Sequence, residues 1–193
     1  MNNSALIAFI RNAAPLTNES AAFLAEQFTY KEIPKGKLLI KIGKVADEYM
    51  FLESGFMRSY LYDTEGNEIT LDFYSTHQVV FEVASFFQRI PSQENFEAMS
   101  DCTGKVLSYE KLNKLFHDLP EFREFGRAIL VKGFIAFKLR TLSLINKTAE
   151  ERYKLLMESN PEIFHHAQLK HLASYLGITD TSLSRIRKSF AQK

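Results

Sequence analysis

The sequence is poor in the residues that build redox and metal centres. It holds one cysteine, Cys102, and no tryptophan. A single cysteine excludes an internal disulfide, a zinc site made of thiolates and a four-cysteine iron–sulfur cluster. The P-loop, the Gly-x-Gly-x-x-Gly turn and the His-Glu-x-x-His spacing are missing too. We therefore expect no metal site and no cofactor, and a protein that is not an enzyme.

The sequence also lacks a strong excess of either charge and any long apolar run. Lysine and arginine number 24 against 23 acidic residues, so the formal net charge of +1 does not by itself indicate a nucleic-acid partner. No apolar run reaches the ~18 residues of a membrane-spanning helix. Residues 1–9 lack the basic stretch and apolar core of a signal peptide. These observations predict a globular, cytoplasmic protein that does not contact a membrane.

Residues 30–109 have the composition and spacing of short β-strands. Runs of four to six residues rich in β-branched and aromatic side chains alternate with glycines, which is typical of an antiparallel roll or barrel. The segment 63–67 between two of these runs has the composition of a hairpin loop. The predicted strands cover 38–40, 49–52, 57–62 and 69–73, and the punctuating glycines are Gly36, Gly43, Gly55 and Gly66.

Helical spacing of apolar residues occurs on both sides of this region. Residues 6–28 predict two short helices. Residues 121–146 carry no proline and predict one helix of 26 residues, about 39 Å long at ~1.5 Å per residue. An ordinary buried helix would explain part of this pattern. We favour a helix that packs against its own copy in a homodimer, with Gly126, Gly133 and Ala136 allowing close approach.

The segment 168–188 has the spacing of a helix-turn-helix unit. Ala173 is small enough for a helix crossing, and Gly177 can adopt the left-handed conformation of the turn. Thr179 is placed to cap the second helix. Apolar residues suit a shared core: Leu169, Leu172 and Leu176 before the turn, and Ile178, Leu183 and Ile186 after it. A further helix is expected from Thr148 to about Ser159.

The second helix of this unit is basic. Residues 165–193 contain five Lys and Arg against Asp180, a local net charge of +4. An αα-hairpin that merely packs explains the apolar spacing but leaves the cations unexplained. A basic helix with short hydroxyl side chains suits the major groove of DNA. The predicted DNA-binding residues are Gln168, Thr179, Asp180, Thr181, Ser182, Ser184, Arg185 and Lys188.

These residues resemble the helix-turn-helix of the Crp/Fnr superfamily of bacterial transcription regulators. The resemblance extends into the strand-rich region, through Lys35-Gly36, Gly43, Asp47, Gly55, Arg58-Ser59-Tyr60 and Gly66-Asn67-Glu68. It implies an α+β fold with an antiparallel β-roll of the cyclic-nucleotide-binding type (a jelly roll) at residues 1–120, a dimerisation helix at 121–147 and a DNA-binding domain at 148–193. It also implies a homodimer on a double-stranded DNA operator of two half-sites, with RNA polymerase as a candidate partner. Only residues 161–167 precede the unit, so we expect a mostly helical domain with a reduced wing.

The resemblance assigns individual roles on the second helix of the unit. Thr179 falls where the family places a phosphate-contacting hydroxyl, and Asp180, Thr181 and Arg185 fall where its base-reading side chains project. Arg185 keeps the usual chemistry. Well-known members carry Arg and Glu at the positions of Asp180 and Thr181, so their operator sequence does not transfer.

The same resemblance implies an effector pocket in the roll, at Phe81, Glu82, Ser85, Ser92, Gln93 and Phe137. Glu82 matches the family's ribose-contacting acid, but Phe81 replaces a glycine that allows close approach to the ligand. Glu94 lies near the place of the arginine that neutralises the phosphate. A phosphate buried without its cation is unfavourable, so we expect neither cAMP nor cGMP. Another effector and an empty structural roll both stay open.

Two further expectations complete the reading of the sequence. His165, His166 and His171 have no evident carboxylate partner, and we expect them at the surface or against phosphate rather than on a metal. The alternative function is a ligand-binding or protein-interaction module whose DNA-binding domain is degenerate. Such a protein would bind DNA weakly and with little sequence preference.

Overall fold

The computed structural model describes residues 3–191, beginning with two helices. The first, α1 (Ser4–Ala13), buries Leu6 and Ile10. The second, α2 (Asn18–Glu26), starts after Thr17, whose hydroxyl accepts a hydrogen bond from the backbone N–H of Ser20 at 3.1 Å. The two predicted helices are thus confirmed, and the break between them falls before Asn18.

A β-roll of two four-stranded sheets follows. One sheet has the order β1-β8-β3-β6 and the other β2-β7-β4-β5, and the pairings within them are antiparallel. The bounds are β1 Thr29–Ile33, β2 Leu38–Ile40, β3 Glu48–Ser54, β4 Met57–Tyr62, β5 Glu68–Tyr74, β6 Val79–Val80, β7 Asn95–Ala98 and β8 Cys102–Ser108. The predicted antiparallel roll is therefore confirmed, and a hairpin loop joins β4 to β5 as expected. A short helix, α3 (Val83–Gln88), lies between β6 and β7.

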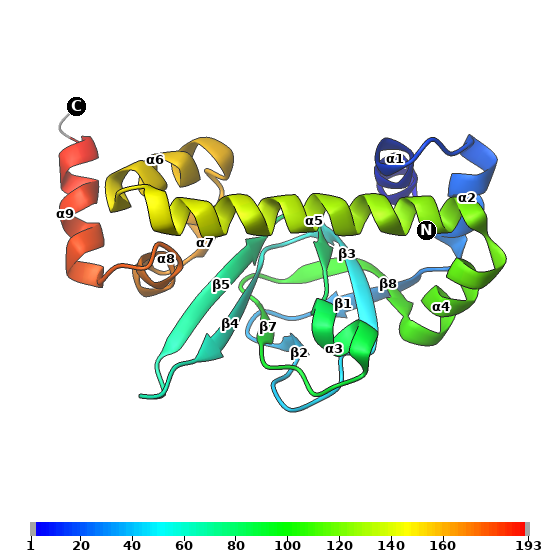
Figure 1. The fold of residues 1–193 in the computed structure, drawn as a ribbon, viewed down its shortest axis with the longest axis horizontal. Helices are drawn as coiled ribbons and strands as arrows, with labels where there is room; N and C mark the ends of the chain where they lie inside the picture. Colours follow the sequence, from blue (N-terminus) through cyan, green and yellow to red (C-terminus); the bar gives the residue numbers. More distant parts are fainter. Residues whose placement is uncertain (1–2, 192–193) are drawn as a thin grey trace.

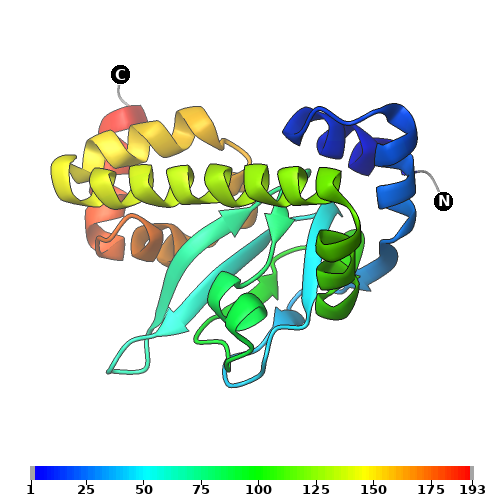
Figure 2. The same cartoon turned by 45° about the vertical axis from the view of Figure 1, so that its right-hand side comes forward.

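The roll leads through α4 (Tyr109–Asp118) into the long helix α5 (Pro120–Asn146), which has 27 residues. Pro120 occupies the first turn, where its missing N–H costs no hydrogen bond. Figures 1 and 2 show α5 running across the roll, with α1 and α2 near one end and the last helices near the other. Gly126 packs beneath Phe116 of its own chain, where a Cβ would come within 2.5 Å of the ring. It therefore serves the packing of α4 on α5 rather than the approach of a second copy.

The remaining helices form a unit that we call the C-terminal helical unit: α6 (Ala149–Ser159), α7 (Ile163–His166), α8 (Leu169–Tyr175) and α9 (Asp180–Ala191). A capping box begins α6, because the Thr148 hydroxyl accepts from the N–H of Glu151 while the Glu151 carboxylate accepts from the N–H of Thr148. No helix within residues 3–191 is long and apolar enough to cross a membrane.

The hydrophobic core has two parts. The larger one joins the inside of the roll to α1, α2 and the first turns of α5. The smaller one belongs to the C-terminal helical unit, and it also takes in Phe56 and Phe73 from the roll. The unit is therefore packed on the roll of its own chain.

Candidate nucleic-acid interface

The turn between α8 and α9 has the geometry of a helix-turn-helix. Gly177 has φ +66°, and the next N–H, of Ile178, returns to the carbonyl of Ala173 at 3.0 Å. The Thr179 hydroxyl accepts from the N–H of Ser182 at 3.3 Å and so caps α9. The predicted left-handed turn at Gly177 and the predicted cap at Thr179 are confirmed.

Two arginines that the sequence reading missed hold this turn in place. Arg152 on α6 donates from Nη2 to the carbonyl of Leu176 at 2.7 Å and from Nη1 to that of Lys147 at 2.6 Å. Arg140 on α5 donates to the carbonyl of Tyr175 at 2.9 Å and lies 3.6 Å from the centre of its ring. Both guanidinium groups thus satisfy carbonyls at the end of α8. Their spacing along the chain carries no motif, so sequence alone offered no signal.

The shared core of α8 and α9 contains most of the apolar residues expected there. Leu172, Ala173, Leu176, Leu183 and Ile186 are buried. Leu169 is 42% exposed, contrary to the expectation. It is the first residue of α8, and the inner face of the helix begins only at His171 and Leu172.

The predicted DNA-binding residues of α9 lie mostly in solvent. Among them Ser182 is half-buried, and its hydroxyl lies 3.0 Å from that of Thr179. Neither Arg185 nor Lys188 forms an ion pair with any residue between 3 and 191. The exposed members are Thr179, Asp180, Thr181, Ser184, Arg185 and Lys188, with Gln168 exposed just before α8. Figure 1 shows α9 at one end of the molecule, past the C-terminal half of α5.

The C-terminal two thirds of α5 carry a series of exposed apolar side chains, which we call the apolar face of α5. Their exposures run from 40% for Leu130 to 77% for Ile145, whereas Phe122 and Phe125 near the helix start are buried. An exposed apolar surface of this extent is unusual for a monomeric protein. The face comprises Leu130, Val131, Phe134, Ile135, Phe137, Leu139, Leu142, Leu144 and Ile145.

The predicted effector residues of the roll are engaged with one another and with the backbone. The Glu82 carboxylate accepts from the N–H of Ala84 at 3.0 Å and from that of Ser85, so it caps α3. The Ser85 hydroxyl accepts from the N–H of Ala46 at 2.7 Å and donates to the carbonyl of Ile90 at 2.6 Å. The amides that could receive a phosphate therefore already hold a carboxylate of the chain.

The other four predicted effector residues are placed differently. Phe81 is half-buried among aromatic rings, with Tyr49 at 5.2 Å between ring centres. The buried Ser92 hydroxyl donates to the carbonyl of Glu94 at 2.8 Å. Gln93 is exposed, and Phe137 belongs to the apolar face of α5 with 68% exposure. Hydrogen bonds thus organise Glu82, Ser85 and Ser92 locally, whereas Phe137 faces solvent.

The charge around these residues is negative. Arg89, which follows α3, pairs with Asp47 at 2.6 Å, donates to the carbonyl of Ala46 and stacks on Tyr109. Burial raises the pKa of Glu94, and the carboxylates of Glu82 and Asp72 raise it further, while a hydrogen bond from Ser59 lowers it. A phosphate would meet carboxylates rather than a free arginine here.

The histidines near the C-terminal helical unit do not share one environment. His165 and His166 are exposed, as expected, but His171 is 7% exposed. Its burial departs from the expectation because α8 packs its His171 face against the roll. No group of three or more His, Cys, Asp or Glu within residues 3–191 is arranged to hold a metal ion.

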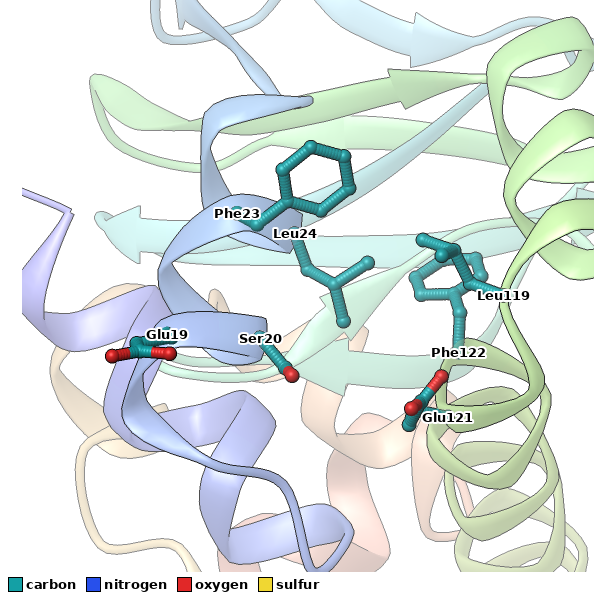
Figure 3. Close-up of a pocket in the computed structure, with 7 residues that line it drawn as sticks. All are labelled: Glu19, Ser20, Phe23, Leu24, Leu119, Glu121 and Phe122. Atoms are coloured by element: carbon teal, nitrogen blue, oxygen red, sulfur yellow. The ribbon is translucent and has the colours of Figure 1, made fainter.

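A separate hollow lies far from α9, between α2 and the start of α5. It has a volume of about 290 Å³. Figure 3 shows the side chains of Phe23 and Leu24 on one side and those of Leu119 and Phe122 on the other. The carboxylates of Glu19 and Glu121 also line it. It sits at the opposite end of the long helix from α9 and is separate from the candidate interface there.

The fold is that of the Crp/Fnr class of transcription regulators: a β-roll, a long helix across it and a terminal helix-turn-helix. Residues 30–118 match the family model described as the cyclic nucleotide-binding domain. No curated protein sequence matches the chain.

Several solved structures share this fold at low sequence identity. The c-di-GMP-responsive global regulator CLP of Xanthomonas campestris has a TM-score of 0.71 at 17% identity, covering 91% of this chain and 92% of that one. FixK2 of Bradyrhizobium japonicum has a TM-score of 0.70 at 20% identity, covering 86% and 85%. The catabolite activator protein of Thermus thermophilus has a TM-score of 0.58 at 19% identity, covering 95% and 87%.

Proposed function

We propose that the chain is a homodimeric, sequence-specific DNA-binding transcription regulator of the Crp/Fnr type. The observation that carries this proposal is the position of α9. Arg185 and Lys188 project from it into solvent without ion-pair partners among residues 3–191, and its buried residues Leu183 and Ile186 hold it on α8. Guanidinium and hydroxyl groups on an exposed helix suit contacts with base edges and phosphates in a major groove.

Dimerisation through α5 would supply the second recognition helix. Two copies that pack their apolar faces in parallel bring both C-terminal helical units to the same end of the pair. Both α9 helices can then meet one duplex at half-sites about one helical turn apart. The proposal keeps the division into an effector roll at 1–120, a dimerisation helix at 121–147 and a DNA-binding domain at 148–193, with RNA polymerase as the further partner.

The charged side chains of the roll restrict which effector it can bind. The carboxylate of Glu82 occupies the α3 amides, and Arg89 is held by Asp47. These contacts support a regulator that takes neither cAMP nor cGMP. They leave the identity of any other effector open.

Genomic selection of bound DNA fragments tests the function directly. A specific regulator should enrich one sequence and prefer it over random DNA by ~10³-fold or more. The degenerate alternative predicts binding that weakens with salt but shows little discrimination among sequences.

A substitution then tests the role of α9 on the selected fragment. Arg185→Ala should weaken binding in a mobility-shift titration by ~1–3 kcal/mol. Arg11→Ala is the matched control, because Arg11 is an exposed arginine on α1, near the other end of the molecule (Figure 1), and should leave the affinity unchanged. Equal affinity of the Arg185→Ala protein and the parent would reject the assignment of α9 as the recognition helix.

A further inference from the structure

The C-terminal helical unit is attached to the roll by a contact that we call the joint, between α8 and the strands β4, β5 and β7. Its apolar part joins Phe73 on β5 to Tyr175 on α8, with ring centres 5.1 Å apart. Phe56, between β3 and β4, stacks on His166 at 5.1 Å. These contacts fix where α8, and therefore α9, stands relative to the roll.

The polar part of the joint links the backbone of β5 to α8. The N–H of Thr70 donates to the Ser174 hydroxyl at 2.7 Å, and this hydroxyl donates to the carbonyl of Glu68 at 3.4 Å. Next to them, Arg58 on β4 is 2% exposed and pairs with Glu68 at 2.6 Å and with Glu97 of β7 at 2.7 Å. A buried cation with two carboxylates therefore lies directly beneath α8.

His171 projects from α8 into this polar cluster. Its Nε2 lies 3.7 Å from the carboxylate of Glu68, too far for a hydrogen bond, and neither ring nitrogen has a hydrogen-bond partner among the described residues. The ring is thus buried next to a guanidinium and carries two polar atoms that the docked arrangement leaves unpaired.

The surroundings of His171 favour its neutral form. Burial is the largest effect, followed by the positive charges of Arg58 and of Lys170 on its own helix. The carboxylates of Glu68 and Glu97 attract a proton but do not outweigh them, and the pKa of His171 falls to about 4. These four residues are the charged groups that act on the ring, from β4, β5, β7 and α8.

We propose that His171 makes the joint a proton-operated latch: the neutral ring allows α8 to dock on the roll, and its protonation releases the C-terminal helical unit. The joint buries His171, half-buries Ser174 and leaves Arg185 and Lys188 of α9 uncovered. The latch therefore controls where the recognition helix is held rather than whether its outer face is accessible. This inference does not depend on DNA binding, because docking is a property of the single chain.

The direction and size of the effect follow from linkage. A released histidine has a pKa near 6.5, so the docked state binds fewer protons and is favoured above that pH. Docking weakens as the pH falls below about 6.5 and stops changing below about 4. Between pH 7.5 and 5 the docking equilibrium constant should fall about 30-fold.

Distance measurement between two labels tests the latch. Thr64→Cys in the β4–β5 loop and Ser184→Cys on α9 place labels on either side of the joint, both at exposed positions. The native Cys102 is 1% exposed, so it should not compete for the label. The short-distance population of the docked chain should dominate at pH 7.5 and decline by pH 5, while circular dichroism reports retained helix.

Two variants distinguish protonation of His171 from other effects of low pH on the protein. His171→Gln cannot take up a proton and should stay docked at pH 5. His165→Gln removes an exposed histidine of the same unit and should behave like the parent. A distance distribution that does not change in the parent between pH 7.5 and 5, or that changes equally in His171→Gln, overturns the proposal.

A nuclear magnetic resonance titration of the His171 ring in the full chain decides the case if His171→Gln fails to dock at either pH. A midpoint below the ordinary value of about 6.5, displaced toward the docked value of about 4, supports the latch. A midpoint at the ordinary value of about 6.5 refutes it, because docking would then be indifferent to the proton.

Discussion

Replacing Phe134 by alanine tests the dimer at the centre of the apolar face of α5. Phe134 is 66% exposed in the single chain. A phenylalanine side chain buries about 200 Å² when fully covered, so a partner helix can remove roughly 130 Å² of it from water. Alanine would retain about a third of that area. At ~25 cal/mol per Å² the loss is about 2 kcal/mol per protomer and about 4 kcal/mol per dimer, which raises the dissociation constant roughly 1,000-fold.

Sedimentation analysis over a range of protein concentrations measures this change. The parent should be a dimer at concentrations where the Phe134→Ala protein is largely monomeric. Tyr62→Ala is the matched control, because Tyr62 is an aromatic residue with 50% exposure at the end of β4, on a hairpin that points away from α5 (Figure 1). A parent that sediments as a monomer, or a Phe134→Ala protein that dimerises as tightly as the parent, would refute the role of this face.

Urea unfolding of three further variants probes the stability of the turn before α9 and of the joint. Gly177→Ala should lower the free energy of unfolding by about 1 kcal/mol, because alanine is strained at the φ of +66° that Gly177 adopts. Steric overlap adds nothing, since the new Cβ would lie at an ordinary contact distance of 3.6 Å from Leu144. Arg58→Met should lower the free energy of unfolding by about 2 kcal/mol. This is less than the full cost of breaking a buried ion pair, because the side chains of Glu68 and Glu97 stay 32% and 26% exposed and water can solvate them. Arg127→Met, which breaks an exposed pair with Glu124, should change it by less than ~0.5 kcal/mol. An Arg58→Met effect no larger than that of Arg127→Met would contradict the buried role of Arg58.

The sequence was informative where local chemistry decides the structure. The predicted strand at 57–62 coincides with β4, and the long helix begins at Pro120 and ends at Asn146 as expected to within a residue. The capping box at Thr148 and the left-handed turn at Gly177 depend on neighbouring residues only. Such features can be read from a short window because their causes lie inside that window.

The features that the sequence did not reveal depend on contacts between distant segments. Strand β8 contains Gly104 and Lys105, which interrupt its apolar pattern, yet it pairs with both β1 and β3. A Cβ added at Gly104 would lie 2.4 Å from the carbonyl oxygen of Phe51, so the strand has room only for glycine there. The burial of His171 results from the packing of α8 on β5, which brings together residues as distant in sequence as Thr70 and Ser174, 104 positions apart. No local pattern distinguishes His171 from the exposed His165, so the joint became visible only in the folded chain.

The response of the roll to cyclic nucleotides is the last prediction, and it follows from the contacts of Glu82. Its carboxylate caps α3 through the N–H groups of Ala84 and Ser85, so a phosphate would have to displace it and then face Glu94 without a free arginine. Calorimetric titration of the protein with cAMP or cGMP should show no heat of binding. Glu82→Ala removes the cap and should destabilise the chain by about 1 kcal/mol without creating a nucleotide site, because the missing cation is not restored. Tight binding of cAMP to the parent protein would show that the roll rearranges these contacts, and the charge argument would then be wrong.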